Sequence, residues 1–299
     1  MNNIAARQNE NDQIECLIVQ RALYSQAKQY FAWRITIALF IAIVGPIVTS
    51  LDEKLTPWVG LIAVIYLFVN VFVLEKLEAA KKLNAAKFQE LFDVCILELP
   101  WNQIVTGHKP DHEFIPSILH STSNVKVDGL LNWYAMDVGK VPLNLGRFLC
   151  QRTNAWWDTK LRQIYIFGLV GVLLLTLVMA VVIGVCLDLT VTKLLLGIVV
   201  PLLPFAEVSV RQIKDNTETA RTTEELRTSI DLEIAKLLEG ETVENANILS
   251  RVFQDQIFRH RMKCPTVFDW LYNVAKKGQE DQMRFSVKAK VNQFLSQKT

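Results

Sequence analysis

The 299-residue sequence lacks most of the motifs on which catalytic sites depend. Its five cysteines are dispersed and include no Cys-x-x-Cys pair, which argues against a disulfide framework or a zinc knuckle and favours reduced thiols. There is no P-loop, nucleophile elbow or zincin helix, and residues 215–231 lack the glycines of a CDP-alcohol transferase site. We therefore predict a protein that is not an enzyme and that holds no metal and no catalytic cofactor.

The sequence also lacks a large excess of charge of either sign. The net charge is only +2, whereas binding of a nucleic-acid polymer relies on many Lys and Arg contacts to phosphates, so we expect no such partner. Residues 1–30 are polar and do not have the pattern of a secretory signal peptide. No strand-like alternation is long enough to predict a β-sheet.

One loop gathers potential metal ligands. His108, Asp111, His112 and Glu113 lie within residues 108–113, together with a proline. A metal site needs three or four converging ligands, and no matching His or Cys helix occurs elsewhere in the sequence. We interpret this stretch as a solvated loop.

Four long apolar runs dominate the rest of the sequence. About 20 apolar residues in a helix cross a bilayer core, and the runs approach or exceed this length. They span Ile35–Leu51, Trp58–Leu74, Ile164–Leu187 and Leu189–Ala206. Short segments, 52–57 and the residues near Asp188, join them in pairs. The pattern predicts an all-α integral membrane protein with four spans in two hairpins.

Charge around the runs predicts their orientation. Lys and Arg near the ends of spans stay on the cytoplasmic side. They flank the outer ends of both pairs, at Arg34, Lys76, Lys81, Lys82, Arg152, Lys160, Arg162, Arg211 and Lys214. The hairpin tips hold Lys54 and Lys193 against three carboxylates, Asp52, Glu53 and Asp188. We therefore expect a multi-pass membrane protein with both termini in the cytoplasm.

This topology divides the chain into five segments. A cytosolic N-terminal helix (1–32) precedes the first transmembrane hairpin (33–75), and a cytosolic helical insert (76–162) precedes the second hairpin (163–207). A cytosolic helical tail follows (208–299). Strong helix formers extend the second span to Leu99, before Pro100, and the fourth span to Leu238, with Gly240 as a C-cap. Further helices are expected over 143–157, 245–261 and 267–277, and residues 287–299 are expected to form another helix or a frayed end.

Glycine and proline within the spans have two interpretations. Proline frees backbone carbonyls and kinks helices, and glycine lets helices approach closely. Ordinary helix packing explains these residues, and so does a bundle that rearranges or opens on a signal. The candidate pore or gating residues are Gly45, Pro46, Gly197, Pro201 and Pro204, with the first helix expected to break at 45–46 and the fourth to be interrupted at its prolines.

Aromatic and basic residues cluster before the third span and in the tail. Trp156-Trp157 suits an aromatic belt at the membrane interface. Together with nearby arginines it also suits a pocket, because purines stack on aromatic rings and phosphates accept hydrogen bonds from Arg. The sequence leaves both interpretations open.

Four elements together resemble one family, the S-4TM (SMODS-associated four-transmembrane) effectors of bacterial defence. They are residues 3–10 with 20–24; 89–93 with Leu97-Glu98-Leu99-Pro100-Trp101-Asn102; Cys150-Gln151-Arg152-Thr153-Asn154-Ala155-Trp156-Trp157-Asp158; and 254–261 followed by 268–272. The resemblance runs nearly end to end.

The resemblance implies a role in anti-phage immunity of the CBASS type. It implies a functional link to a cGAS-like nucleotidyltransferase, a cyclic oligonucleotide as regulatory ligand, and injury to the inner membrane that arrests or kills the infected cell. We expect a homo-oligomeric pore in the lipid bilayer, because four spans alone enclose little space. The candidate ligand-binding residues are Arg152, Trp156, Arg259, His260 and Arg261. Two other functions remain open: a membrane scaffold or receptor that recruits a cytosolic partner, and a channel unrelated to defence.

Overall fold

Long helices without internal breaks build almost the whole protein. The computed structural model describes residues 1–111, 113–121, 129–186, 188, 190–195, 200–267 and 269–297. Within these ranges there are helices, turns and loops but no β-strand, which confirms the all-α prediction.

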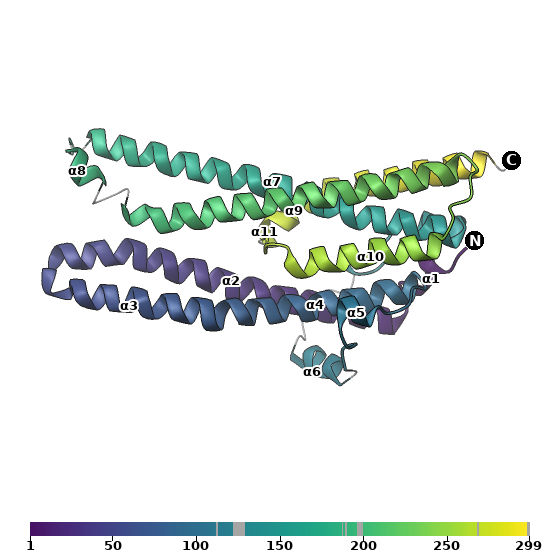
Figure 1. Cartoon of the computed structure of the whole chain (residues 1–299), viewed down its shortest axis with the longest axis horizontal. Coiled ribbons are helices and arrows are strands. Elements are labelled where there is room, and N and C mark those ends of the chain that lie inside the picture. Colours follow the sequence, from purple (N-terminus) through teal and green to yellow (C-terminus); the bar gives the residue numbers. More distant parts are fainter. Residues whose placement is uncertain are drawn as a thin grey trace.

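The first helix pair runs out and back. Helix α2 (Asn11–Leu51) leads through a short 3₁₀ turn, η1 (Glu53–Leu55), into α3 (Thr56–Val69). A π-helical turn, η2 (Asn70–Leu74), then continues directly into α4 (Glu75–Ile96). Helix α2 lies antiparallel to α3 and α4 along its length (Figure 1). We call the outer part of this pair, residues 35–74, the first arm.

The predicted break at Gly45-Pro46 is wrong, because α2 continues through both residues. A proline inside a helix removes one backbone hydrogen bond, but the rest of a 41-residue helix remains bonded. Gly45 has a packing role instead: a Cβ atom there would lie 3.0 Å from Cγ1 of Val59 on α3. The glycine therefore lets the two helices of the first arm approach closely.

The second helix pair has the same design. Helix α7 (Leu143–Cys186) is followed by the short α8 (Val191–Leu194) and by α9 (Val200–Leu238), which packs along α7 (Figure 1). The described part of α9, which begins at Val200, continues as a helix through Pro201 and Pro204, so the predicted interruption at these prolines is wrong. Gly197 lies outside the described residues. We call residues 164–206 the second arm.

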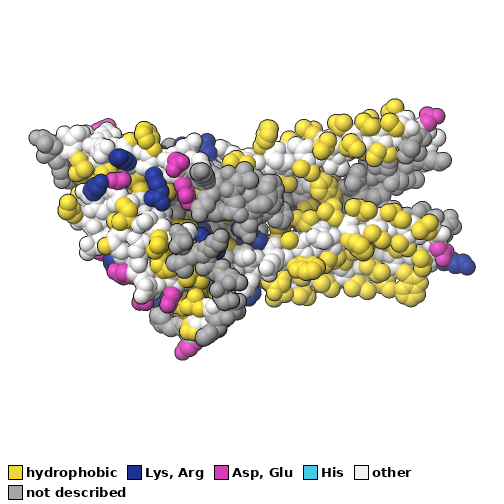
Figure 2. Space-filling model, turned by 180° about the vertical axis from the view of Figure 1, so that it is seen from behind, with side chains coloured by type: hydrophobic (Ala, Val, Ile, Leu, Met, Phe, Trp, Pro, Cys, Tyr) yellow, Lys and Arg dark blue, Asp and Glu magenta, His cyan; other side chains and the backbone are white. Residues whose placement is uncertain are grey.

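Among the residues that the structure describes, three helical stretches are long and apolar enough to cross a membrane: Asn11–Gly45, Pro57–Ile96 and Leu143–Cys186. Apolar side chains cover the visible faces of both arms (Figure 2). Phe167, for example, is 83% exposed. An apolar surface of this extent is unfavourable in water and favourable in lipid. The protein therefore has the character of a membrane protein.

The remaining helices form a polar part that we call the head. It contains the polar ends of α2, α4, α7 and α9 together with α1 (Ile4–Arg7), α5 (Gln103–Thr106), α6 (Phe114–Ser121), η4 (Met136–Lys140), α10 (Ala246–Lys263) and α11 (Asp269–Ser296). The 44 residues of α7 span about 66 Å, roughly twice a bilayer core, so one helix serves both arm and head. Helix α10 packs between α4 and α7 (Figure 1).

Buried apolar side chains hold the head together. Its core joins residues from all the long helices, including Leu17, Leu23, Phe88, Phe92, Phe148, Ile230, Ile234 and Val291. Helix α9 ends at Leu238 and Gly240 has φ +83°, which confirms the predicted C-cap. The tail differs from the prediction of a helix over 267–277 and another helix or frayed end over 287–299, because α11 is one helix over Asp269–Ser296. Its buried Met283, Val287 and Val291 keep it against the core.

Candidate functional site

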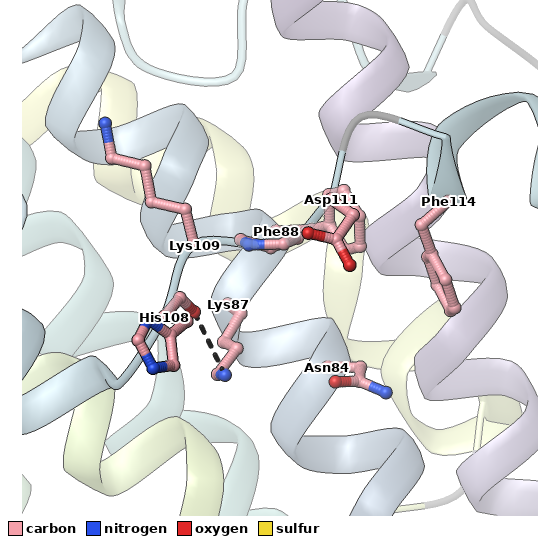
Figure 3. Close-up of a pocket in the computed structure, with 8 residues that line it drawn as sticks. Asn84, Lys87, Phe88, His108, Lys109, Asp111 and Phe114 are labelled. Atoms are coloured by element: carbon pink, nitrogen blue, oxygen red, sulfur yellow. Dashed lines mark hydrogen bonds between the residues drawn. The ribbon is translucent and has the colours of Figure 1, made fainter.

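A pocket of about 420 Å³ lies between α4 and the loop that precedes α6 (Figure 3). Its volume falls within the range of small-molecule sites, which is roughly 300–1,000 Å³. The loop wraps over α4 so that Lys87, Asn84 and Asp111 surround one space. The lining residues are Asn84, Lys87, Phe88, His108, Lys109, Pro110, Asp111 and Phe114.

Local hydrogen bonds shape the loop. Gly107 has φ +70°, a conformation that glycine adopts without strain, and its carbonyl accepts a bond of 2.8 Å from Nε1 of Trp101. The Lys87 ammonium donates to the carbonyl oxygen of His108 at 3.1 Å. Nε2 of Gln103 lies 3.1 Å from Nδ1 of the same histidine. The side chains of His108, Lys109, Asp111 and Glu113 are exposed, which agrees with our interpretation of 108–113 as a solvated loop, and these bonds hold the loop against α4 and α5.

Two aromatic contacts fix the walls of the pocket. The buried Phe88 ring stacks on Phe114 with centroids 5.7 Å apart. The Lys109 ammonium lies 6.0 Å from the centroid of the Trp101 ring, a cation–π contact. The half-buried ring of Phe114 is thus held in place at the edge of the pocket.

The segment before α5, residues 100–102, is bonded to α10. Nδ2 of Asn102 donates to Asp255 at 2.7 Å, and Arg251 donates to the carbonyl of Pro100 at 2.8 Å. Arg251 also pairs with Glu90 on α4 at 2.6 Å. The pocket loop reaches α10 through this segment, by the bond between Trp101 and Gly107.

A buried polar network joins α10 to α4 behind the pocket. Glu90 and Asp93 are both 0% exposed, and Gln254 donates to each of them, at 2.8 Å and 3.0 Å. Burial raises the pKa of Glu90, and the charge of Arg251 offsets part of this effect. Arg261 pairs with Asp93 at 2.6 Å. Burial alone would lower the pKa of Arg261, but the charge of Asp93 raises it above its usual value.

A second network lies where the head meets the arms. Arg34 on α2 binds Asn70 of the π-helical turn at 2.7 Å and pairs with Glu75 and Glu78 at 2.5 Å each. The hydroxyl of Thr266, which follows α10, donates to Glu78 at 2.8 Å. The first arm is thus bonded to the segment after α10.

The same segment reaches the second arm. Arg162 on α7 donates to Asp158 at 2.7 Å, to Asn216 of α9 at 2.6 Å and to the carbonyl of Pro265 at 3.4 Å. We call residues 264–266 the connector. It contacts Glu78 at the base of the first arm and Arg162 at the base of the second, and so it links the two arms.

The structure places the five predicted ligand residues in different surroundings. Arg152 faces α9 and α11, pairing with Asp231 at 2.7 Å, while Arg261 faces α4. Trp156 is half-buried against the core of the head, Arg259 is exposed and His260 is half-buried. Their role as ligand contacts stays a prediction, although two of the arginines already have carboxylate partners within the protein.

Sequence reasoning missed the pocket residues. Asn84, Lys87 and Phe88 share one face of α4 by their spacing of three and four residues, which is a visible signal. That the loop of residues 107–111 would fold onto this face depends on contacts distant in sequence. Within the described ranges, no cluster of three His, Cys, Asp or Glu side chains is arranged to hold a metal ion.

Acid should weaken the fold through His260. Burial lowers the pKa of His260 from 6.5, with the charges of Arg162 and Lys263 acting in the same direction and Asp158 against it. The unfolded chain then binds the proton at higher pH than the folded one, so stability falls as pH decreases below about 6.5. We expect the unfolding temperature in detergent to drop more between about pH 7.5 and pH 5.5 for the wild type than for His260→Gln. Parallel pH profiles would contradict this assignment.

Comparison with known proteins points to one family. The SMODS-associating 4TM effector domain matches residues 2–290. A protein of Bacillus cereus (strain VD146), named "Probable CBASS effector molecule", is 26% identical over 286 residues, which cover 93% of this chain and 94% of that protein. No solved structure matches the chain significantly. Because the family match extends over nearly all residues, the chain belongs to the SMODS-associating 4TM effector family.

Proposed function

We propose that this protein is a non-enzymatic membrane effector of CBASS anti-phage defence. A cyclic oligonucleotide made by a cGAS-like nucleotidyltransferase regulates it, and it disrupts the inner membrane so that the infected cell stops growing or dies. Membership of the effector family and the name of the Bacillus relative support the defence role. The observation that carries the membrane role is the pair of apolar arms joined to one polar head.

The proposed topology has four spans. They are the four apolar runs, residues 35–51, 58–74, 164–187 and 189–206, with the head and both termini in the cytoplasm. The positive charge around the head ends of the spans supports this orientation. The N-terminus and the end of α11 also lie at the side of the head that is farthest from the arm tips (Figure 1).

Membrane damage then requires more than one copy. One chain contributes only two helix pairs. Their apolar faces are exposed and need lipid or further helices as neighbours. We propose that copies assemble into a homo-oligomeric pore. Gly45, Pro46, Gly197, Pro201 and Pro204 remain candidates for residues that adjust during opening, because proline and glycine weaken or thin a helix locally.

The connector offers a route from head to arms. Nucleotide binding can shift the arms only if the two arrangements differ in affinity for the nucleotide. Contacts at both arm bases, through Glu78 and through Arg162, let one movement of α10 act on both helix pairs.

Reconstitution tests the proposed function. The full chain is placed in liposomes that contain a self-quenched dye, with cyclic di-AMP, cyclic di-GMP or cyclic tri-AMP added separately. We expect one nucleotide to change the rate of dye release by a factor of about 5–150, the usual size of a coupling between sites. Absence of release under every condition would favour a scaffold or receptor. Release that no nucleotide alters would favour a channel without this regulation.

A further inference from the structure

We infer that a purine nucleotide binds in the pocket between α4, the loop of residues 107–111 and Phe114, with a phosphate at Lys87 and the base at Phe114. This inference rests on the proposed function, because it assigns a site to the regulatory nucleotide. It differs from the set predicted around Arg152 and Arg259–Arg261. The pocket brings together the three kinds of group that a nucleotide requires.

The first kind is a cation for the phosphate. Figure 3 shows the Lys87 ammonium between the backbone of His108 and Asn84. An ammonium has three N–H donors, and the bond to the His108 carbonyl uses one of them. Lys109 also lines the pocket, but its ammonium lies over the Trp101 ring, so Lys87 is the lysine whose charge faces the space. The remaining donors of Lys87 can bind a phosphate.

The second kind is an aromatic face for the base. Phe114 stands at the opposite side of the pocket from Lys87 and His108 (Figure 3). Its ring is half-buried and is kept in place by the stack on Phe88. Proteins hold unpaired bases by stacking them on such rings, and a ring that is already ordered loses little freedom when it does so.

The third kind is a pair of polar groups for the edge of the base. The Asp111 carboxylate and the Asn84 amide both line the space between Lys87 and Phe114. A carboxylate accepts hydrogen bonds from the amino and imino groups of a purine, and an amide both donates and accepts. The Asp111 carboxylate, which only accepts hydrogen bonds, would repel a plain phosphate or a fatty acid and so favours a ligand that carries donors.

The position of the pocket suits a regulatory site. A nucleotide there would contact α4 and the loop at once. The loop is joined by the Trp101–Gly107 bond to residues 100–102, which are bonded to α10 through Asn102–Asp255 and Arg251–Pro100. Helix α10 ends at Lys263, directly before the connector. Occupation of the pocket can therefore move the helix that leads to both arm bases.

Binding by the full chain in detergent micelles tests the inference, with the same three cyclic nucleotides as probes. Lys87→Glu reverses the charge at the phosphate, and Lys81→Glu makes the same change on α4 outside the pocket. We expect Lys87→Glu to weaken binding of the active nucleotide by at least about tenfold and Lys81→Glu to leave it within about twofold. Phe114→Leu should also weaken binding, because it removes the stacking face. Lys87→Met, which keeps the side-chain length, provides the phosphate test if the glutamate variant does not fold.

The outcomes separate this inference from the proposed function. If the wild type responds to a nucleotide and Lys87→Glu, Lys87→Met and Phe114→Leu bind it as the wild type does, the pocket assignment is wrong and the proposed function stands. If no probe binds and none alters dye release from wild-type liposomes, both fail. Loss of binding in Lys87→Glu together with Lys81→Glu would also overturn the assignment, since it would indicate a general effect of charge.

Discussion

Replacing Asp93 with asparagine should destabilise the head by about 3–5 kcal/mol, the usual cost of leaving a buried charge without its partner. The Asp93 side chain is 0% exposed and pairs with Arg261, whose own side chain is 11% exposed. It also accepts hydrogen bonds from Tyr134 at 2.7 Å and Gln254 at 3.0 Å. Asparagine preserves the shape of the side chain but leaves the Arg261 charge uncompensated.

Arg261 is already incompletely hydrogen-bonded. Its Nη2 atom is buried and has no hydrogen-bond partner in the part of the chain that the structure describes. Unfolding in detergent, followed by tryptophan fluorescence against denaturant, measures the effect. Glu98→Gln is the matched control, because Glu98 pairs with Arg7 at the surface and such pairs contribute only about 0–1 kcal/mol.

A double variant makes the test sharper. Adding Arg261→Met to Asp93→Asn removes the unpaired charge and should recover a large part of the lost stability, as replacement of buried ion pairs often does. If the double variant is less stable than Asp93→Asn by the full cost of a second lesion, the two residues act independently. The network between α4 and α10 would then not depend on their pairing.

Glu78→Ala should uncouple dye release from nucleotide. Glu78 is the acceptor for both Arg34 and Thr266, so it joins the first arm to the connector. Hydrogen bonds to a charged group contribute about 1.5–3 kcal/mol, which corresponds to a factor of about ten or more in an equilibrium between two arrangements. We expect the ratio of release rates with and without the active nucleotide to fall to about one.

Glu75→Ala is the control for this variant. Glu75 pairs with the same arginine at 2.5 Å, and the contact between the connector and Glu78 does not involve it. Thr266→Val removes the connector's hydroxyl alone and should resemble Glu78→Ala. An intact nucleotide response in Glu78→Ala and Thr266→Val would show that the signal does not pass through this contact. An equal loss in Glu75→Ala would indicate that pairing within the first arm matters instead.

The local patterns of the sequence predicted the helical architecture well. Apolar runs near the length of a bilayer and strong helix formers beyond them predicted the all-helical class, the extension of α3 into α4 and the end of α9 at Leu238. Local signals of this kind act within a few residues, through helix propensity and capping. They were misleading where packing opposes them. Gly45-Pro46 reads as a helix break, yet close packing on Val59 and the bonds of a long helix keep α2 continuous.

The candidate site could not be predicted from the sequence, and the reason is different. Lys87 lies on α4 and Asp111 in a loop that looked solvated, and nothing in their spacing requires them to meet. Likewise, Glu78, Arg162 and Thr266 are far apart in the chain, and folding alone brings the connector to both arm bases. Hydropathy and charge along the chain determine which segments are apolar, which are helical and which ends are basic. Which buried carboxylate meets which arginine, and where a loop closes over a helix, is decided by tertiary packing, because those contacts form only after distant helices have buried their apolar faces together.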